Sequence, residues 1–135
     1  MYFLIEEMIE TLKSDPSMAG IKVAETYAVS EMKVPMVTMS EEPGQGYMYP
    51  DGKPRVIRSL YQLETYSKQG GGKTALQNAR ELMDRATTII NKRYGLTQFG
   101  QARFAPYMED PSVIRGVVLY YAVIDTETDF IYRNV

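Results

Sequence analysis

The sequence contains no cysteine and no histidine among its 135 residues, and these two absences limit the chemistry open to it. Without cysteine there are no disulfides, thiol nucleophiles or zinc-thiolate sites. Without histidine there is no Ser-His-Asp machinery and no side chain that titrates near neutrality at its ordinary pKa. Any catalysis would have to use carboxylates, Lys, Arg or Tyr. We identify no catalytic residue, metal ligand or cofactor-binding residue, and predict that the protein is not an enzyme.

A strong charge of either sign and a long apolar run are also missing. Fifteen Lys and Arg stand against 17 Asp and Glu, giving a net charge of −2, which argues against a general nucleic-acid binder. The longest wholly apolar run, Val117 to Ile124, is too short to cross a bilayer as a helix. The N-terminus lacks the basic region of a secretory signal. We expect one soluble, non-secreted domain over residues 1–135, without a membrane partner.

Two segments have the apolar spacing of amphipathic helices. The first runs from Tyr2 to Ser14, where Asp15-Pro16 ends it. The second runs from Thr74 to Tyr94 and begins with a capping box of Thr74 and Gln77. The expected buried stripes are Leu4, Ile5, Met8, Ile9 and Leu12 in the first helix, and Leu76, Ala79, Met83, Ala86 and Ile90 in the second.

The remaining ordered segments have the pattern of strands. We predict strands over residues 21–29, 34–40, 55–67, 96–104, 115–125 and 130–133. The strand over 115–125 is apolar on both faces, which predicts burial on both sides, either as an ordinary central strand or under another subunit. The order of elements predicts an α+β domain with a mostly antiparallel sheet and two main helices packed on one face.

Residues 41–54 are rich in Pro and Gly and form the longest predicted connection. A turn signal at Pro50-Asp51-Gly52-Lys53 indicates that Tyr47 to Tyr49 pairs back onto Arg55 to Ile57 as a protruding hairpin. We interpret the preceding pair Glu41 and Glu42 as solvating this loop rather than as an acid-base pair.

Two short motifs suggest ligand chemistry, and each has a simpler structural explanation. Gly70-Gly71-Gly72-Lys73-Thr74 resembles the end of a phosphate-binding loop, but Ser67 stands where that pattern requires its first glycine. Thr74 has a sufficient role as a helix cap. A second motif, Asp125, Glu127 and Asp129, has alternate acidic residues but lacks the glycine of a calcium loop, so a polar turn is the preferred interpretation.

Four long segments taken in order carry a resemblance to a known family. They are DPSMAGIKVAETYAVSEMKVPMVTMSE at 15–41, DGKPRVIRSLYQLETYSK at 51–68, TALQNARELMDRATTIINKRYGLTQFG at 74–100 and IDTETDFIYR at 124–133. Together with the N-terminal helix, they make the chain similar to the tail terminator, or tail-to-head joining, proteins of long non-contractile-tailed bacteriophages and prophages.

This resemblance implies a virion structural protein that forms a ring, typically a hexamer, on the completed tail tube. The ring would stop tail growth and join the tail to the head connector. The implied partners are further copies of the chain, the tail tube protein and the head-tail connector protein, with at most transient DNA contact. The implied locations are the virion tail and, during assembly, the bacterial cytoplasm.

Aromatic and arginine residues on the expected edges and loops are our candidates for contacts with these partners. They are Tyr47, Tyr49, Arg55, Arg58, Phe130 and Tyr132. Three alternatives stay open at the level of sequence. They are a head-completion or connector ring protein, a small nucleotide-binding protein that uses Gly72, Lys73 and Thr74, and an adaptor domain with a peptide-binding sheet edge.

Overall fold

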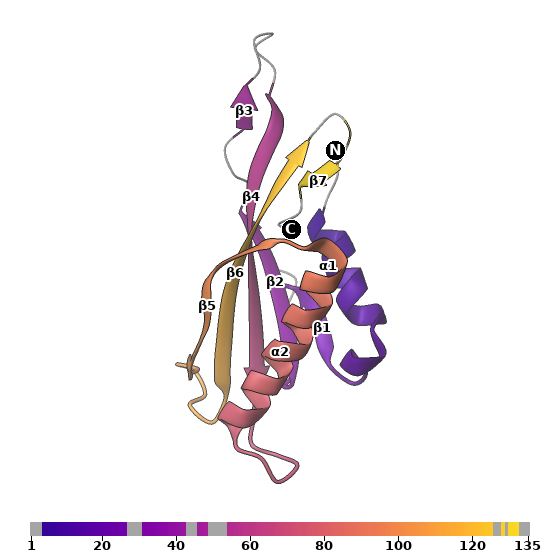
Figure 1. Cartoon of the computed structure of the whole chain (residues 1–135). Helices are drawn as coiled ribbons and strands as arrows, with labels where there is room; N and C mark the ends of the chain where they lie inside the picture. The colour runs from indigo at the N-terminus through magenta and orange to yellow at the C-terminus, as the bar shows by residue number, and fades with distance from the viewer. Residues whose placement is uncertain are drawn as a thin grey trace.

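The computed structural model describes residues 4–26, 31–42, 46–48, 54–125, 128 and 130–132. These residues form an α+β fold in which two helices lie against one face of a seven-stranded sheet (Figure 1). The helices are α1 (Leu4–Ser14) and α2 (Ala75–Tyr94), and a short 3-10 helix, η1 (Pro16–Met18), follows α1. The strands are β1 (Lys22–Glu25), β2 (Met36–Glu42), β3 (Gly46–Met48), β4 (Pro54–Ser67), β5 (Thr97–Pro106), β6 (Ile114–Asp125) and β7 (Phe130–Tyr132).

The sheet is mostly antiparallel, as predicted. Its main strand order is β1-β2-β4-β6-β5, and only β1 and β2 pair in parallel. The long strands β4 and β6 form the centre and pair from Val56 with Asp125 to Ser67 with Ile114. Strands β3 and β7 pair with the far ends of β4 and β6. We call this end of the sheet the hairpin end.

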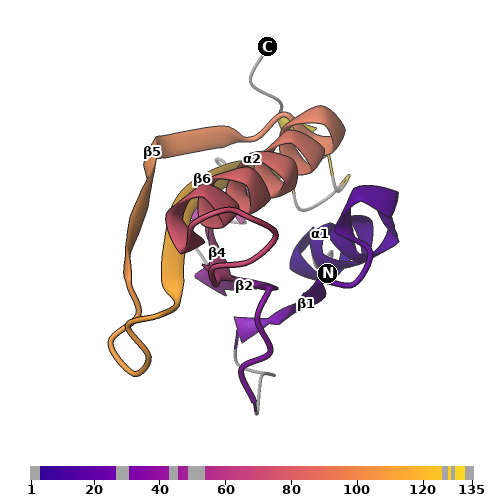
Figure 2. The same cartoon turned by 90° about the horizontal axis from the view of Figure 1, so that it is seen from below.

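Both helices cover the same face of the sheet, which agrees with the prediction (Figure 2). Helix α2 lies over the central strands β4 and β6, whereas α1 lies over β1 and β2. The five apolar residues predicted for α1 are all buried and join the main core, although its described part begins at Leu4. The opposite face of the sheet carries no helix in the described part of the chain. We call it the open face.

Helix α2 begins and ends where its sequence signals predict. The Thr74 hydroxyl accepts a hydrogen bond from the Gln77 amide, and the Gln77 side chain accepts one from the Thr74 amide. Gly95 ends the helix in the left-handed region at φ 60°, which glycine adopts without strain. One member of the predicted stripe was wrong. Leu76 is 38% exposed, because the first turn of α2 carries it outside the core.

Three strand predictions needed correction. The segment predicted over 21–29 is a strand only from Lys22 to Glu25, and residues 27–29 lie outside the described part. Glu41 and Glu42 belong to β2 rather than to a loop, because they pair with Tyr61 and Leu60 of β4. The strand predicted over 96–104 runs instead over Thr97–Pro106, with an irregularity in its pairing to β6 between Phe99 and Arg103.

The strand predicted to be buried on both sides has only one fully buried face. Val118, Tyr120, Ala122 and Ile124 are buried in the main core on the helix side, whereas the alternate residues of β6 on the open face are half-buried. Strand β6 is indeed central in the sheet. Nothing in the described part of this chain covers the outer side of its hairpin end.

Candidate interaction surface on the open face

The open face consists of the alternate residues of each long strand. Because β4 and β6 pair antiparallel, Leu60 lies beside Tyr121, Gln62 beside Leu119 and Glu64 beside Val117. Each of these pairs is continued across the sheet by a residue of β2 next to β4, and by residues of β5 next to β6. The resulting surface mixes apolar side chains with a few charged ones, and it divides into two parts with different surroundings.

The part away from the hairpin end is covered by the chain itself. Met36 and Tyr66 of the open face form a small second core with Val113. The ring of Tyr107 meets the ring of Tyr66 edge-on, with centroids 5.5 Å apart. The loop between β5 and β6 therefore folds back over this part of the face and supplies its cover.

The part toward the hairpin end lacks such a cover in the described residues. Leu60, Leu119, Tyr121 and Val123 are half-buried there, and no helix of the described chain lies over this side of the sheet. Phe99 of β5 pairs with Leu119 and is 58% exposed. An apolar surface of this kind on a globular domain is typical of a contact site for another protein.

Arg58 is the predicted contact residue whose side chain the structure describes. Its neighbour in β4, Ile57, packs against the core, and successive side chains of a strand point to opposite faces. Arg58 therefore lies on the open face. Its guanidinium carbon is 4.1 Å from the centroid of the Tyr121 ring, a cation-π contact. Arg58 thus presents its charge on top of an aromatic ring within the uncovered apolar area, as arginines at protein interfaces often do.

Four of the other predicted contact residues belong to strands at the same end of the sheet, namely Tyr47 of β3, Arg55 of β4, and Phe130 and Tyr132 of β7. By register, Tyr47 of β3 pairs with Val56 of β4, and Asp125 of β6 pairs with both Val56 and Phe130. Tyr132 of β7 pairs with Val123 of β6, two residues along the strand from the pair of Phe130 with Asp125. The side chains of Tyr47, Arg55, Phe130 and Tyr132, and the whole of Tyr49, lie outside the described part of the structure.

A buried carboxylate organises the centre of the open face, and the sequence analysis missed its role. Glu64 is 4% exposed, although it is a charged residue on the face of the sheet that carries no helix in the described part of the chain. Arg115 donates to its two oxygens from Nη2 at 2.9 Å and Nε at 3.3 Å, and Tyr66 and Gln62 donate as well. Burial raises the pKa of Glu64, but these hydrogen bonds outweigh it and hold the pKa below its ordinary value.

An open, acidic pocket of about 600 Å³ borders this cluster. It lies where β2 extends beyond β1, since β1 pairs only with Met36 to Met39. Its lining is Thr26, Ser40, Glu41, Glu42, Leu60, Gln62, Glu64 and Leu119. Burial and the nearby carboxylate of Glu25 raise the pKa of Glu41. None of the described residues that line the pocket is basic, so this lining is suited to a cation with an apolar stem.

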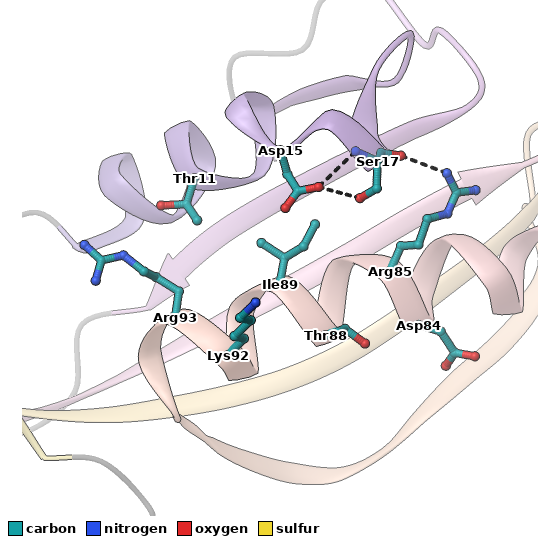
Figure 3. Close-up of a pocket in the computed structure, with 9 residues that line it drawn as sticks. All are labelled: Thr11, Asp15, Ser17, Asp84, Arg85, Thr88, Ile89, Lys92 and Arg93. Atoms are coloured by element: carbon teal, nitrogen blue, oxygen red, sulfur yellow. Dashed lines mark hydrogen bonds between the residues drawn. The ribbon is translucent and has the colours of Figure 1, made fainter.

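A second pocket, of about 650 Å³, lies between α1, η1 and α2 (Figure 3). Three of its lining residues, Asp15, Ser17 and Arg85, are hydrogen-bonded to one another. Asp15 accepts hydrogen bonds from the amide and the hydroxyl of Ser17, and Arg85 donates to the Ser17 carbonyl at 3.0 Å. Arg93 pairs with Glu7 across the two helices. These contacts fasten α1 to α2, so this pocket serves the packing of the helices.

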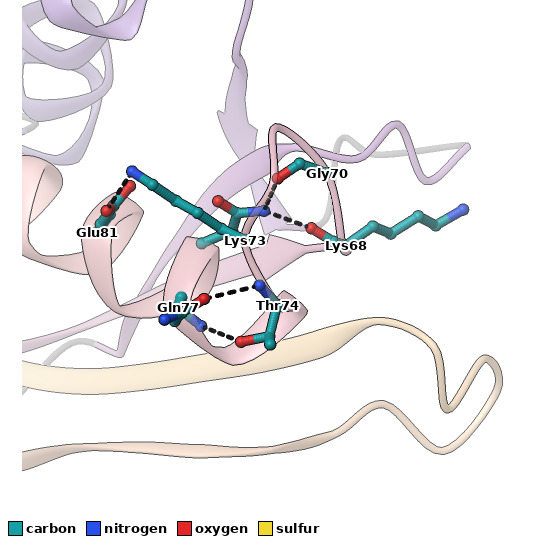
Figure 4. Close-up of polar contacts among 7 residues, drawn as sticks. Lys68, Gly70, Lys73, Thr74, Gln77 and Glu81 are labelled. Atoms are coloured by element: carbon teal, nitrogen blue, oxygen red, sulfur yellow. Dashed lines mark hydrogen bonds and ion pairs between the residues drawn. The ribbon is translucent and has the colours of Figure 1, made fainter.

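The glycine-rich turn that resembled a phosphate-binding loop has a structural arrangement (Figure 4). The amides and carbonyls of Gly70 and Lys73 bond to each other and close the turn. Lys73 Nζ lies 2.6 Å from a carboxylate oxygen of Glu81, and Asn78 donates to the carbonyls of Lys68 and Gly70. Thr74 caps α2. The Gly70 and Lys73 amides, the Lys73 ammonium and the Thr74 hydroxyl thus have partners within the chain, which fits a structural role for the turn.

The acidic turn after β6 also shows a local role. The Asp125 carboxylate accepts a hydrogen bond from the amide of Thr128, whereas Glu127 and Asp129 lie outside the described part. Among the described residues, no group of three acidic side chains is placed to hold a metal ion. Within the same residues, neither helix has the length and apolar character needed to span a membrane.

The geometry therefore favours the open face near the hairpin end as the candidate functional site. The sequence points to Arg58 and to this end of the sheet, but not to Phe99, Glu64 or the acidic pocket. A compositional signal for Phe99 was present, because it is an aromatic residue in a strand otherwise rich in exposed polar and small residues. In the comparisons with known proteins, no family model and no curated protein matches this chain.

Proposed function

We propose that the protein is a virion structural protein that caps the completed tail tube of a long-tailed bacteriophage. As an oligomeric ring it would stop tail growth and join the tail to the head connector. The proposal begins from the resemblance of the ordered segments to tail terminator proteins. The observation that carries it in the structure is the uncovered apolar area around Leu119, Tyr121 and Phe99 on the open face.

In this proposal the protein works by surface complementarity and has no enzymatic activity or cofactor. A ring seated on the last ring of the tube would bury the surface to which the next tube subunit adds. The hairpin end is suited to such contacts, since β3 and β7 extend the sheet beyond the helices there (Figure 1). Arg58 on the Tyr121 ring is a preformed anchor for a partner.

The partners in this proposal are further copies of the chain, the tail tube protein and the head-tail connector protein. Assembly would take place in the bacterial cytoplasm, and the product would be part of the virion tail. A head-completion ring is the nearest alternative within this class, and binding to tube protein rather than to the connector alone separates the two roles.

The experiment that tests the proposal is light scattering over a wide concentration range, with negative-stain electron microscopy of the same samples. The expected result is a closed ring of several copies with a central hole. A chain that stays monomeric at the highest concentration, or forms only compact dimers without a hole, would contradict the proposed function.

A further inference from the structure

The two sides of the sheet differ in shape and in charge. Strand β5 forms one side, and α1, β1 and β2 form the other, as Figures 1 and 2 both show. Residues 1–42 contain three lysines and eight acidic residues, a net charge of −5. Residues 43–135 contain twelve basic and nine acidic residues, a net charge of +3. The acidic segment is therefore confined to one side of the molecule.

The β5 side presents an unpaired strand. Among the described residues, β5 pairs with β6 on one side and with no strand on the other. It contains one charged residue, Arg103, which is exposed, and the exposed aromatic ring of Phe99. A free strand edge of ten residues is a ready template for pairing with another chain.

The opposite side offers the complementary chemistry. Past the end of β1, residues 40–42 of β2 have no strand partner on their outer side in the described part of the chain. The exposed carboxylate of Glu42 lies there, beside the acidic pocket lined by Leu60 and Leu119. The Thr26 hydroxyl at this pocket has no hydrogen-bond partner among the described residues. A cation and an apolar ring from a neighbour would match this lining.

We propose that copies of this chain associate side by side, the β5 edge of one against the β1–β2 edge of the next, with Arg103 facing the carboxylates at the acidic pocket. Strands β2 and β5 run in opposite directions, because each step from β2 through β4 and β6 to β5 is antiparallel. Two copies in the same orientation therefore place these edges antiparallel. The inference rests on the proposed function for the ring, and it identifies which surfaces form that ring.

Two different surfaces that meet in this way form a head-to-tail interface, which closes into a ring when the rotation between copies allows it. A partner of another kind would need its own cation for the pocket and its own acid for Arg103. A second copy supplies both from the same sequence. The competing explanation is that Arg103 and the pairing irregularity protect β5 from association, as charges and bulges do on edge strands. Charge reversal at Arg103 separates these explanations, because it weakens assembly only if Arg103 lies in the interface.

The test uses two charge reversals, Arg103→Glu and Glu42→Arg, each on an exposed side chain. Each variant alone should place like charges at every interface and raise the concentration needed for half-assembly about tenfold or more. An equimolar mixture of the two should assemble as well as the wild type, because opposite charges again face each other wherever one variant meets the other. Arg80→Glu, on the exposed surface of α2, is the matched control and should assemble normally.

Sedimentation velocity measures assembly, and negative-stain images of the same samples show whether a central hole is present. Two results overturn the interface: single variants that assemble like the wild type, or single variants that stay apart and are not restored by mixing. If the wild type forms rings with a hole in either case, the proposed function stands without this interface. Restoration by mixing that gives only particles without a hole supports the interface and contradicts the proposed ring. A wild type that never associates overturns both.

Discussion

Replacing Arg115 with methionine should expose how much the open face depends on the buried Glu64 carboxylate. The substitution keeps a long side chain but removes the donors at 2.9 Å and 3.3 Å. Glu64, at 4% exposed, would retain only the hydrogen bonds from Tyr66 and Gln62. A buried carboxylate that loses its cation is destabilising because its desolvation is no longer offset.

The size of the loss follows from the exposure of each partner. Removing one member of a fully buried ion pair costs about 3–5 kcal/mol, and a hydrogen bond to a charged group contributes about 1.5–3 kcal/mol. The Arg115 side chain is 38% exposed, so water can reach part of the vacated space. We therefore expect Arg115→Met to lower the free energy of unfolding at neutral pH by about 2 kcal/mol.

Urea unfolding of a double-mutant cycle with Glu64→Gln measures this interaction. All variants are compared at one protein concentration, because association raises apparent stability. In the Glu64→Gln background, Arg115→Met should cost far less, giving a coupling energy of about 1–2 kcal/mol. A coupling below about 0.5 kcal/mol, within the ordinary range of a surface substitution, would refute the reasoning.

The pH dependence gives a second measure of the same interaction. The pKa of Glu64 lies below its ordinary value of 4.5 in the folded protein. Its stabilising contribution is therefore complete above pH 4.5 and is lost as the pH falls through the folded-state pKa. Arg115→Met should weaken this acid-side loss. Stability profiles that stay parallel down to low pH in the wild type and the variant would contradict the assignment.

Two further predictions concern the core of the sheet and the acidic pocket. A Cβ at Gly116 would lie 2.6 Å from Thr65 Oγ1 and 2.8 Å from Phe104 Cε1, so Gly116→Ala should lower the unfolding midpoint in urea by overpacking, at a cost of about 1–3 kcal/mol. Unchanged stability would show that the site has room. The pKa of Glu41 is raised by burial and by Glu25, so its ionisation costs stability as the pH rises from 4.5 toward neutrality. Glu41→Gln should remove that decline and be more stable than the wild type at neutral pH, and a variant with an unchanged pH profile would disprove it.

Local signals predicted the helices well because each helix is specified by its own residues. The apolar spacing of α1 and the capping box and terminal glycine of α2 act within a few residues, and the structure has all of them in place. Leu76 fits the same periodic pattern as the buried stripe but lies in the first turn, beyond the core. The whole fold determines which turn of a helix extends beyond the sheet that the helix covers. The spacing of apolar residues along the helix cannot show this.

The open face was less predictable, because its organisation depends on distant pairs. Glu64 and Arg115 are 51 residues apart, and only the antiparallel register of β4 with β6 brings them together. Similarly, an apolar pattern on both faces of β6 predicts burial on both sides without saying what covers them. The acidic pocket arises from the early end of β1 at Glu25, and the sequence predicted a strand continuing past that point.

The way this chain covers its open face supports the proposal that the hairpin end is a contact surface. In the described part of the chain, α1 and α2 lie on one face of the sheet, so cover for the other face comes from loops or from another molecule. The loop between β5 and β6 covers Met36 and Tyr66, which shows that the chain can close apolar surface on this face with its own residues. The same chain leaves Leu119 half-buried and Phe99 exposed next to a charged edge and an acidic pocket. Burial of these residues by another protein, such as the proposed tail partner, would complete the sheet's second layer where the chain itself does not supply one.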